Sequence, residues 1–333
     1  MQIAIIGAGL SGLICARALQ TRGHHVTVFE KSNGVSGRIS TRRTEFGGFD
    51  HGAQYFTITT KKFKAEADRW IKSGWVAPWQ GRLVKLDNGR VASATKSSAS
   101  KTRYVGVPGM RNIGEQLAQG IDVKVGQRVA RIERFGHQWI LAVHADTVPI
   151  AATAGPFDAV VVAVPADQAA PLLSFDPAFS SQAESARLVP CWTLMLAFQQ
   201  SLELGFEGAW VSESRLGWIA QDASKPGRRP GEHWVCNATS AWSIEHLEDE
   251  PERAKDKLLK AFQLATATQV QPVHAAVHRW RYAQAAQPLQ GDCLWNAETR
   301  LGACGDWFSN GLAGAGRIEN AFLSGTALAA LMR

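Results

Sequence analysis

The first thirty residues constrain the fold more than any other part of the chain. An apolar strand pattern over residues 2–6 leads into the segment GAGLSG at 7–12, a helical pattern follows to Leu19, and a second strand pattern over 25–30 ends in Glu30. This order is the fingerprint of a βαβ unit that binds a dinucleotide. A lone GxGxxG would be a weak signal, but here the strand, the helix and the acid are all in register.

Each glycine of this fingerprint has a separate predicted role. Gly7 allows the tight turn, Gly9 lets the backbone approach a pyrophosphate, and Gly12 lets the helix and the strand pack closely. The free N–H groups and the positive dipole end of the helix favour phosphates. Glu30 stands where a carboxylate can accept both hydroxyls of an adenosine ribose.

Length and composition indicate a two-domain globular chain. The 333 residues can bury a sizeable core, and 45% hydrophobic with 20% charged residues excludes a disordered chain. No run of about 18 apolar residues is present, so no transmembrane helix is expected. The first strand begins at Gln2, which leaves no room for a cleavable signal peptide. We therefore expect a cytoplasmic protein.

The cysteines and the net charge argue against a metal site and against nucleic acid. The five cysteines are scattered, without a CxxC pair or a His–Cys cluster, and are interpreted as reduced thiols. The net charge is +7, but lysines and arginines do not form a long run. A mildly positive surface that steers anionic cofactors and substrates is the favoured interpretation.

The loop after Glu30 distinguishes between dinucleotides. Many NAD proteins enter another helix here, whereas flavoproteins of the glutathione-reductase and amine-oxidase types place a Gly-Arg pair, as this chain does at Gly37-Arg38. The planar fork of Arg38 can clamp the second phosphate of FAD. A solvated loop arginine is the alternative interpretation.

The middle of the chain predicts a parallel central strand and a second, sheet-based domain. Residues 159–165 form a continuous apolar run, which suits a central strand of a parallel sheet. Residues 122–125, 128–133 and 139–144 alternate like short antiparallel strands. Helices are predicted over 112–119 and 248–266, and strands of the second domain over 192–198, 210–213, 217–221, 233–239 and 273–282.

The last stretch returns to the first domain. A short apolar strand from Leu301 ends in Gly305-Asp306, which places a carboxylate at the edge of the sheet where ligands bind. A glycine-rich loop over 310–316 and a helix over 317–332 follow. Because no second acid-terminated GxGxxG unit is present in the sequence, a dedicated nicotinamide domain is not expected.

Together these residues resemble the FAD-dependent amine-oxidase superfamily, and within it the bacterial renalase-like flavoproteins. The most specific motifs are Gln54-Tyr55-Phe56-Thr57, Ser224-Lys225-Pro226 and Cys304-Gly305-Asp306-Trp307. The resemblance covers nearly the whole chain and includes Asp50 with Gly52-Ala53, Gly106 with Pro108-Gly109-Met110, Ala238-Thr239-Ser240 with Trp242-Ser243, His278-Arg279-Trp280 with Tyr282-Ala283, and Gly316-Arg317-Ile318-Glu319-Asn320-Ala321.

The resemblance implies an α/β fold with two domains, of the amine-oxidase/p-hydroxybenzoate-hydroxylase type. A discontinuous Rossmann-like FAD domain would comprise residues 1–57, 105–165 and 286–333. A smaller substrate domain with a mixed or antiparallel sheet would comprise residues 58–104 and 166–285, over the isoalloxazine.

The resemblance also implies the residues that hold FAD. Val129 would offer backbone groups to the adenine, Asp306 would meet the ribityl chain or the pyrophosphate, and N–H groups near Ile318 and Glu319 would face the flavin N1–O2 edge. No cysteine stands where some amine oxidases attach flavin, so the FAD is expected to be non-covalent. The full predicted set is Gly7, Gly9, Ser11, Gly12, Glu30, Arg38, Gln54, Val129, Asp306, Ile318 and Glu319.

The implied activity is oxidation of isomeric dihydronicotinamide dinucleotides (2- or 6-dihydroNAD(P)) to NAD(P)+, with hydrogen peroxide formed when oxygen reoxidises the flavin. No convincing acid–base pair is found in the sequence, so only substrate-positioning candidates are assigned. These candidates are Gln54, Tyr55, Thr57, Tyr104, Thr239, Trp280 and Tyr282. The expected partners are a small-molecule substrate and oxygen, in a monomer or weak homodimer without nucleic acid or membrane.

Two alternatives stay open. One is a flavin amine oxidase or desaturase that acts on a hydrophobic small molecule, with Trp280 and Tyr282 forming an aromatic cage. The other is a non-catalytic flavin-binding module. Two departures from the renalase-like pattern put the substrate's shape in doubt: a longer loop over 308–316, and Glu319-Asn320 where Glu-Gly is usual.

Overall fold

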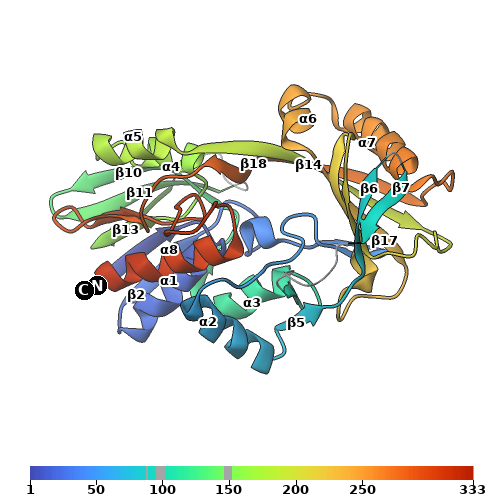
Figure 1. Cartoon of the computed structure of the whole chain (residues 1–333). Coiled ribbons are helices and arrows are strands. Elements are labelled where there is room, and N and C mark those ends of the chain that lie inside the picture. The colour runs from blue at the N-terminus through green and yellow to red at the C-terminus, as the bar shows by residue number, and fades with distance from the viewer. Residues whose placement is uncertain (88, 95–101, 146–151, 333) are drawn as a thin grey trace. The chain divides into compact units, whose positions relative to one another are not determined.

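A computed structural model describes residues 1–87, 89–94, 102–145 and 152–332 (Figure 1). Packing divides the chain into two compact units, and each unit is discontinuous in sequence. Unit 1 comprises Met1–Arg38, Ile113–Leu188 and Gln284–Arg333, and unit 2 comprises Ile39–Asn112 and Val189–Ala283. The predicted α/β fold with two discontinuous parts is confirmed. By packing, residues 39–57 and 105–112 belong with unit 2, and residues 166–188 and 284–285 with unit 1. The predicted domains divide the chain by the ligand that each part would bind, and their extents stay a prediction.

Unit 1 is built on a six-stranded sheet. Its order is β19 (Leu294–Asn296), β20 (Leu301–Ala303), β13 (Ala159–Val162), β1 (Gln2–Ile6), β2 (His25–Phe29) and β9 (Asp122–Lys124). All neighbours are parallel except β19 and β20. The central position predicted for the apolar run at 159 is confirmed. The antiparallel strand expected at 122–125 is wrong: these residues extend the parallel sheet beside β2.

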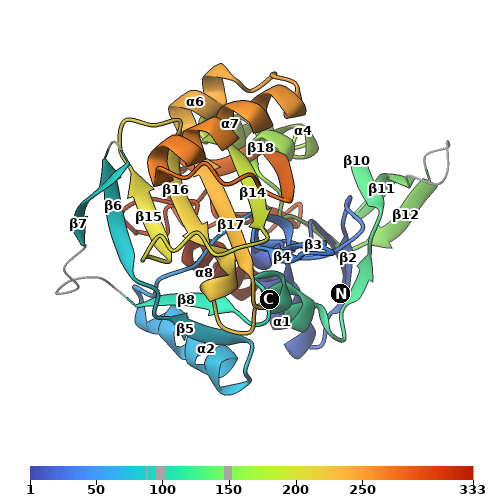
Figure 2. The same cartoon turned by 90° about the vertical axis from the view of Figure 1, so that its right-hand side faces the viewer.

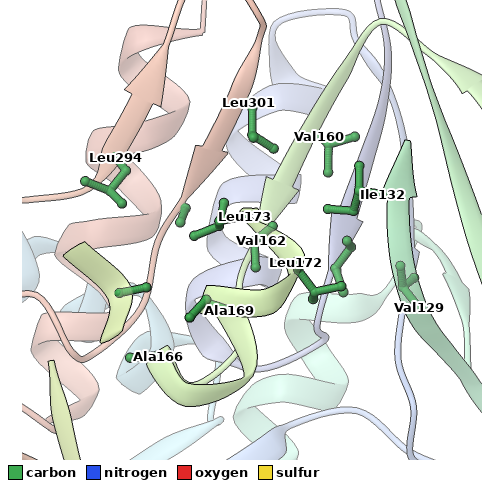
Figure 3. Close-up of a cluster of buried hydrophobic side chains, with 14 of the residues drawn as sticks. Val129, Ile132, Val160, Val162, Ala166, Ala169, Leu172, Leu173, Leu294 and Leu301 are labelled. Atoms are coloured by element: carbon green, nitrogen blue, oxygen red, sulfur yellow. The ribbon is translucent and has the colours of Figure 1, made fainter. Parts of the chain in front are cut away.

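A three-stranded antiparallel sheet covers part of this core. It comprises β10 (Gln127–Phe135), β11 (Gln138–Ala145) and β12 (Ala152–Phe157), so the other two predicted strands are confirmed. Val129 and Ile132 of β10 pack with Val160 and Val162 of β13 and with Leu173 in one apolar cluster (Figure 3). The helices α4 (Ala166–Leu172) and α5 (Pro177–Ser185) were not predicted.

Two helices pack against each other beside the parallel sheet: α1 (Leu10–Thr21) and α8 (Ile318–Leu331) (Figure 1). Their contact needs a glycine, because a Cβ at Gly325 would stand 2.3 Å from the Ser11 carbonyl oxygen. This packing brings the two ends of the sequence together.

Unit 2 contains a seven-stranded mixed sheet. Its order is β18 (His274–Gln287), β14 (Arg187–Phe198), β17 (Glu232–Ala238), β16 (Leu216–Gln221), β15 (Gly208–Val211), β6 (Leu83–Asp87) and β7 (Arg90–Ala94). β15 and β6 are parallel, whereas the β14–β17, β17–β16, β16–β15 and β6–β7 pairs are antiparallel. The mixed sheet predicted for the second domain is confirmed.

The two faces of this sheet differ in character. α6 (Ser240–Glu245) and α7 (Pro251–Thr266) cover one face (Figure 2). Trp192, Trp234 and Phe262 are buried on this side. Side chains alternate along a strand, so their neighbours in sequence point the other way. We call this other side the second face. It comprises Thr193, Trp210, Trp218, Asn237, His278, Trp280 and Tyr282.

The rest of unit 2 forms two small strand pairs, one helix, and the start of a second helix. β3 (Arg42–Thr44) pairs with β4 (Gly47–Phe49), and β5 (Val76–Trp79) pairs with β8 (Arg103–Gly106). The helices are α2 (Lys61–Lys72) and α3 (Arg111–Ala118), the second of which crosses into unit 1. None of the helices among the described residues combines the length and the apolar character that a membrane crossing requires.

Candidate functional site

In the glycine turn over residues 7–12, two glycines are needed for packing within the protein and one leaves space for a ligand. Gly7 has a φ of +105°, and a Cβ there would stand 2.5 Å from the Ala163 carbonyl oxygen. A Cβ at Gly12 would stand 2.1 Å from the Gly7 carbonyl oxygen. At Gly9, by contrast, φ is −74° and a Cβ would meet nothing within 4 Å. The chain's own packing therefore needs glycine at 7 and 12, while the space above Gly9 is available to a ligand.

The start of α1 offers the positive end of a helix dipole at the same place. Gly9 is the N-cap, so no side chain caps the helix, and its first turn contains no acidic residue. Free N–H groups at an uncapped N-terminus bind anions, and phosphate suits them best. The turn thus has the space and the electrostatics that a pyrophosphate requires.

Glu30 lies at the end of β2 with most of its surface buried. One carboxylate oxygen accepts the Ala8 N–H at 2.9 Å, and the other accepts the Ser32 N–H at 2.9 Å and the Ser32 hydroxyl at 2.5 Å. These bonds fix the carboxylate, and the oxygen bound by Ala8 can accept a further donor. Val129 lies on β10 next to a β-bulge.

The loop after Ser32 folds back over the glycine turn. Ser36 donates its N–H to the Ala8 carbonyl at 2.9 Å, and a Cβ on Gly37 would stand 3.2 Å from the Gly9 Cα. This contact places Arg38, which donates to the Asp306 carboxylate just beyond β20 at 2.5 Å. Two predicted cofactor residues that lie 268 positions apart are therefore side by side.

Arg38 is partly exposed, and its planar guanidinium can donate to a phosphate as well as to Asp306. Removal of a charged phosphate contact typically costs about 1.5–3 kcal/mol, or roughly 10- to 150-fold in affinity. We predict that Arg38→Ala retains its fold and loses FAD on gel filtration, as measured by the ratio of flavin to protein absorbance. Full flavin content in this variant would refute the phosphate-clamp assignment.

The start of α8 shows what Asn320 contacts in this chain. Asn320 is fully buried, and its Nδ2 donates to the carbonyls of Phe308 at 3.1 Å and Ser309 at 3.0 Å. The asparagine thus ties the beginning of the longer 308–316 loop to the helix. Ile318 and Glu319 are also buried, and Arg317, the N-cap, makes no side-chain capping bond.

Unit 2 holds a buried group of four charges that sequence reasoning missed. Lys225 Nζ lies 2.5 Å from Asp222 and 3.4 Å from Asp50, and Arg228 donates to the same Asp50 carboxylate. Burial alone would raise the pKa of Asp50, but Lys225 and Arg228, with hydrogen bonds from Thr41 and the Met110 amide, hold it below its usual value. Burial and the nearby Asp50 raise the pKa of Asp222, against the effect of Lys225 and Arg228. The group matches two acids with two bases.

Gln54 belongs to this charge group. Its Nε2 donates to the Asp50 carbonyl at 2.6 Å, and its Oε1 accepts from Lys225 at 3.2 Å. Gln54 is thus fixed inside unit 2. The Ser224-Lys225-Pro226 segment forms a turn, and its lysine side chain is entirely buried.

The other predicted positioning residues have different environments. The Arg103 guanidinium lies over the Tyr55 ring, 5.2 Å from the ring centroid. Tyr104 stacks on Phe56, with 5.7 Å between the ring centroids. Thr57 and Tyr282 are half-buried. The Thr239 hydroxyl accepts the Trp242 N–H as the N-cap of α6, so its contact is a structural one.

Trp280 forms part of an aromatic group with two histidines. Its Nε1 donates to the His51 carbonyl at 2.8 Å. Its ring stacks on the His51 ring with 5.2 Å between centroids and meets the His278 ring edge to face with 4.3 Å between centroids. Burial lowers the pKa of His51 to about 3, helped by His278 and Arg42. Burial and Arg42 lower the pKa of His278 to about 4. Both imidazoles are therefore neutral at physiological pH.

The sequence was compared with protein families and curated proteins. A domain described as NAD(P)-binding Rossmann-like matches residues 5–69, and the flavin containing amine oxidoreductase family matches residues 87–333. A 4,4'-diapophytoene desaturase of Staphylococcus aureus is 46% identical over 52 residues, which are 16% of this chain and 10% of that protein. The alignment thus spans about a tenth of the curated relative.

Solved structures share the fold at low identity. A protein of Exiguobacterium sp. 255-15 named as a protoporphyrinogen oxidase has a TM-score of 0.76 at 12% identity, with 99% of this chain and 98% of that chain covered. Putrescine oxidase bound to putrescine has a TM-score of 0.69 at 13% identity, with coverages of 100% and 99%. An oxidoreductase from Methanosarcina mazei has a TM-score of 0.64 at 15% identity, with both chains fully covered.

The fold and the dinucleotide turn define a flavoprotein with a Rossmann-like domain. The chain belongs to the flavin-containing amine oxidoreductase family, whose match covers more than half of its length. Membership of this family makes it an FAD-dependent oxidoreductase. The space at Gly9 and the uncapped start of α1 fit the FAD pyrophosphate, and the fixed Glu30 carboxylate fits its ribose.

Proposed function

We propose that this oxidoreductase oxidises isomeric dihydronicotinamide dinucleotides to NAD(P)+. The substrate would give up one hydride and become an aromatic cation, and oxygen would take up the two electrons and two protons to form hydrogen peroxide. When bound, FAD supplies the hydride acceptor. The renalase-like motifs support this substrate within the family.

The charge of the second face is the observation that carries the proposal. Arg42 lies beside His278, and Arg103 lies over the rings of Tyr55 and Trp210 at 5.2 and 5.3 Å. Neither arginine forms an ion pair with a carboxylate among the residues that the structure describes. Asp50 and Asp222 pair with Lys225 and Arg228, so the buried four-charge group supplies no carboxylate to either arginine. Such a face attracts an anionic molecule, and a dinucleotide is one.

The same charges disfavour an ammonium substrate. An amine enters as a cation at neutral pH, and two uncompensated arginines raise its energy. The two histidines have depressed pKa values, so they are poor bases for removing an ammonium proton. A dihydropyridine needs no such base, because aromatisation drives loss of its hydride.

The chain's residues would then act by positioning. Aromatic rings on the second face, Trp280 and Tyr282 among them, can orient a planar ring and exclude water. Hydride transfer requires the donor carbon about 3–3.5 Å from its acceptor, and holding it there supplies much of the rate. Gln54, fixed by Lys225, would add a preorganised amide.

A flavin amine oxidase or a desaturase acting on a hydrophobic molecule is the second candidate. Membership of the amine oxidoreductase family and the local likeness to a desaturase favour it. Under this alternative, the aromatic rings near Trp280 would hold an apolar substrate, and the two arginines would have no substrate partner.

Steady-state oxygen consumption distinguishes these candidates. We expect turnover with 2- and 6-dihydroNAD(P), with one NAD(P)+ and one hydrogen peroxide formed for each oxygen consumed. We expect no turnover with ordinary NAD(P)H, which is the 4-dihydro isomer, or with amines. Turnover with putrescine or another amine, together with inert dihydronicotinamide isomers, would favour the second candidate and refute the first.

A further inference from the structure

Four side chains from three parts of unit 2 form a group that the fold does not use for its core. We call it the Arg42 cluster; it comprises Arg42, His51, His278 and Trp280. Arg42 Nη2 lies 3.2 Å from His278 Nδ1, and the rings of His278 and His51 meet edge to face at 4.9 Å. Trp280 contacts both imidazoles.

The protonation of the cluster follows from these contacts. A guanidinium only donates, so His278 Nδ1 accepts from Arg42, and the proton of the neutral imidazole lies on Nε2. The charged groups acting on the histidines are Arg42 and, for His51, also Asp50, which is itself paired with Lys225 and Arg228. The cluster therefore carries one positive charge, on Arg42, together with imidazole hydrogen-bonding groups.

One buried atom of the cluster lacks a hydrogen-bond partner, and its half-buried arginine contacts an imidazole rather than a carboxylate. His51 is 6% exposed, yet its Nδ1 has no hydrogen-bond partner among the described residues. Arg42 faces a neutral imidazole, whereas Arg228 in the same unit bonds directly to a carboxylate. A buried polar atom left without a partner costs about 1–3 kcal/mol, so a ligand that satisfies it gains affinity.

We propose that the Arg42 cluster is the subsite that binds a phosphate group of the dinucleotide substrate. The proposal rests on the proposed function and adds to it. A phosphate offers several acceptor oxygens and a negative charge, which match the guanidinium fork and the imidazole N–H groups. A bound phosphate would also favour the protonated histidines, so binding should strengthen as the pH falls toward their range.

The test compares Arg42→Gln with Arg43→Gln. Arg43 is the next residue of β3 and is exposed, so its replacement removes the same charge from the neighbouring position. We expect Arg42→Gln to raise the KM for 2- and 6-dihydroNAD by roughly 10- to 100-fold and to leave that for dihydronicotinamide riboside, which has no phosphate, within about twofold. Arg43→Gln should change neither, and Arg42→Lys should restore part of the difference.

Direct binding separates this proposal from the proposed function. The probes are ADP-ribose, inorganic phosphate and adenosine. Tryptophan fluorescence of the FAD-loaded protein measures their binding without turnover. ADP-ribose binding that is lost in Arg42→Gln and kept in Arg43→Gln supports the subsite even if no isomer is oxidised. Equal binding by all variants, or loss of FAD from Arg42→Gln, overturns it even if the isomers are oxidised. Binding of inorganic phosphate as tight as that of ADP-ribose would also overturn a dinucleotide subsite.

Discussion

Gly9→Ala is expected to empty much of the FAD site while leaving the fold intact. The added methyl group meets no protein atom within 4 Å, and the φ of −74° suits alanine. The methyl group would instead occupy space above the helix start, where the pyrophosphate fits. Crowding of this kind costs about 1–3 kcal/mol, which corresponds to a roughly 5- to 150-fold weaker affinity for FAD.

Gly12→Ala is the matched control, because the same methyl group is added three residues along. Its Cβ would stand 2.1 Å from a backbone oxygen of Gly7, so the helix and the turn must separate. We expect a lower melting temperature with or without added FAD, whereas Gly9→Ala should melt like the wild-type apoprotein. FAD titration and circular dichroism measure the two effects. Wild-type FAD affinity in Gly9→Ala would show that the pyrophosphate lies elsewhere.

Lys225→Met is expected to destabilise unit 2 by about 3–5 kcal/mol, because it leaves two buried carboxylates facing a single Arg228. The lysine side chain is fully buried between Asp50 and Asp222, and it also holds Gln54. The measurement is a urea titration followed by tryptophan fluorescence. Lys64→Met is the control: Lys64 pairs with Asp68 on an exposed helix face, and such pairs contribute at most about 1 kcal/mol.

The double variant Asp222→Asn/Lys225→Met makes this test sharper. Removing one carboxylate together with the lysine restores charge balance, so part of the lost stability should return. An unfolding midpoint for Lys225→Met equal to that of Lys64→Met would contradict the account of a buried, mutually dependent charge group.

Local patterns in the sequence predicted most of the fold. The βαβ unit at the N-terminus, the apolar run that became β13, and the charged helix that became α7 each have a periodicity that one segment determines alone. The position of β9 could not be predicted in this way, because pairing with β2 depends on a partner about 95 residues away rather than on the strand's own alternation.

The candidate site was predictable only where single residues carry a motif. Arg38 and Asp306 were both predicted, yet their ion pair was not, since nothing local links them. Arg42, His51 and His278 were missed for the same reason: β3 and β18 come together only in the folded unit. Asn320 was noted as a departure from a pattern, and its bonds to Phe308 and Ser309 gave the reason.

Anaerobic mixing of the FAD-loaded protein with dihydronicotinamide isomers tests the central claim most directly. We predict that 2- or 6-dihydroNAD bleaches the flavin absorbance within milliseconds to seconds and yields one NAD+ per flavin, while a panel of amines leaves the spectrum unchanged. Bleaching by amines alone, with the isomers inert, would contradict the account.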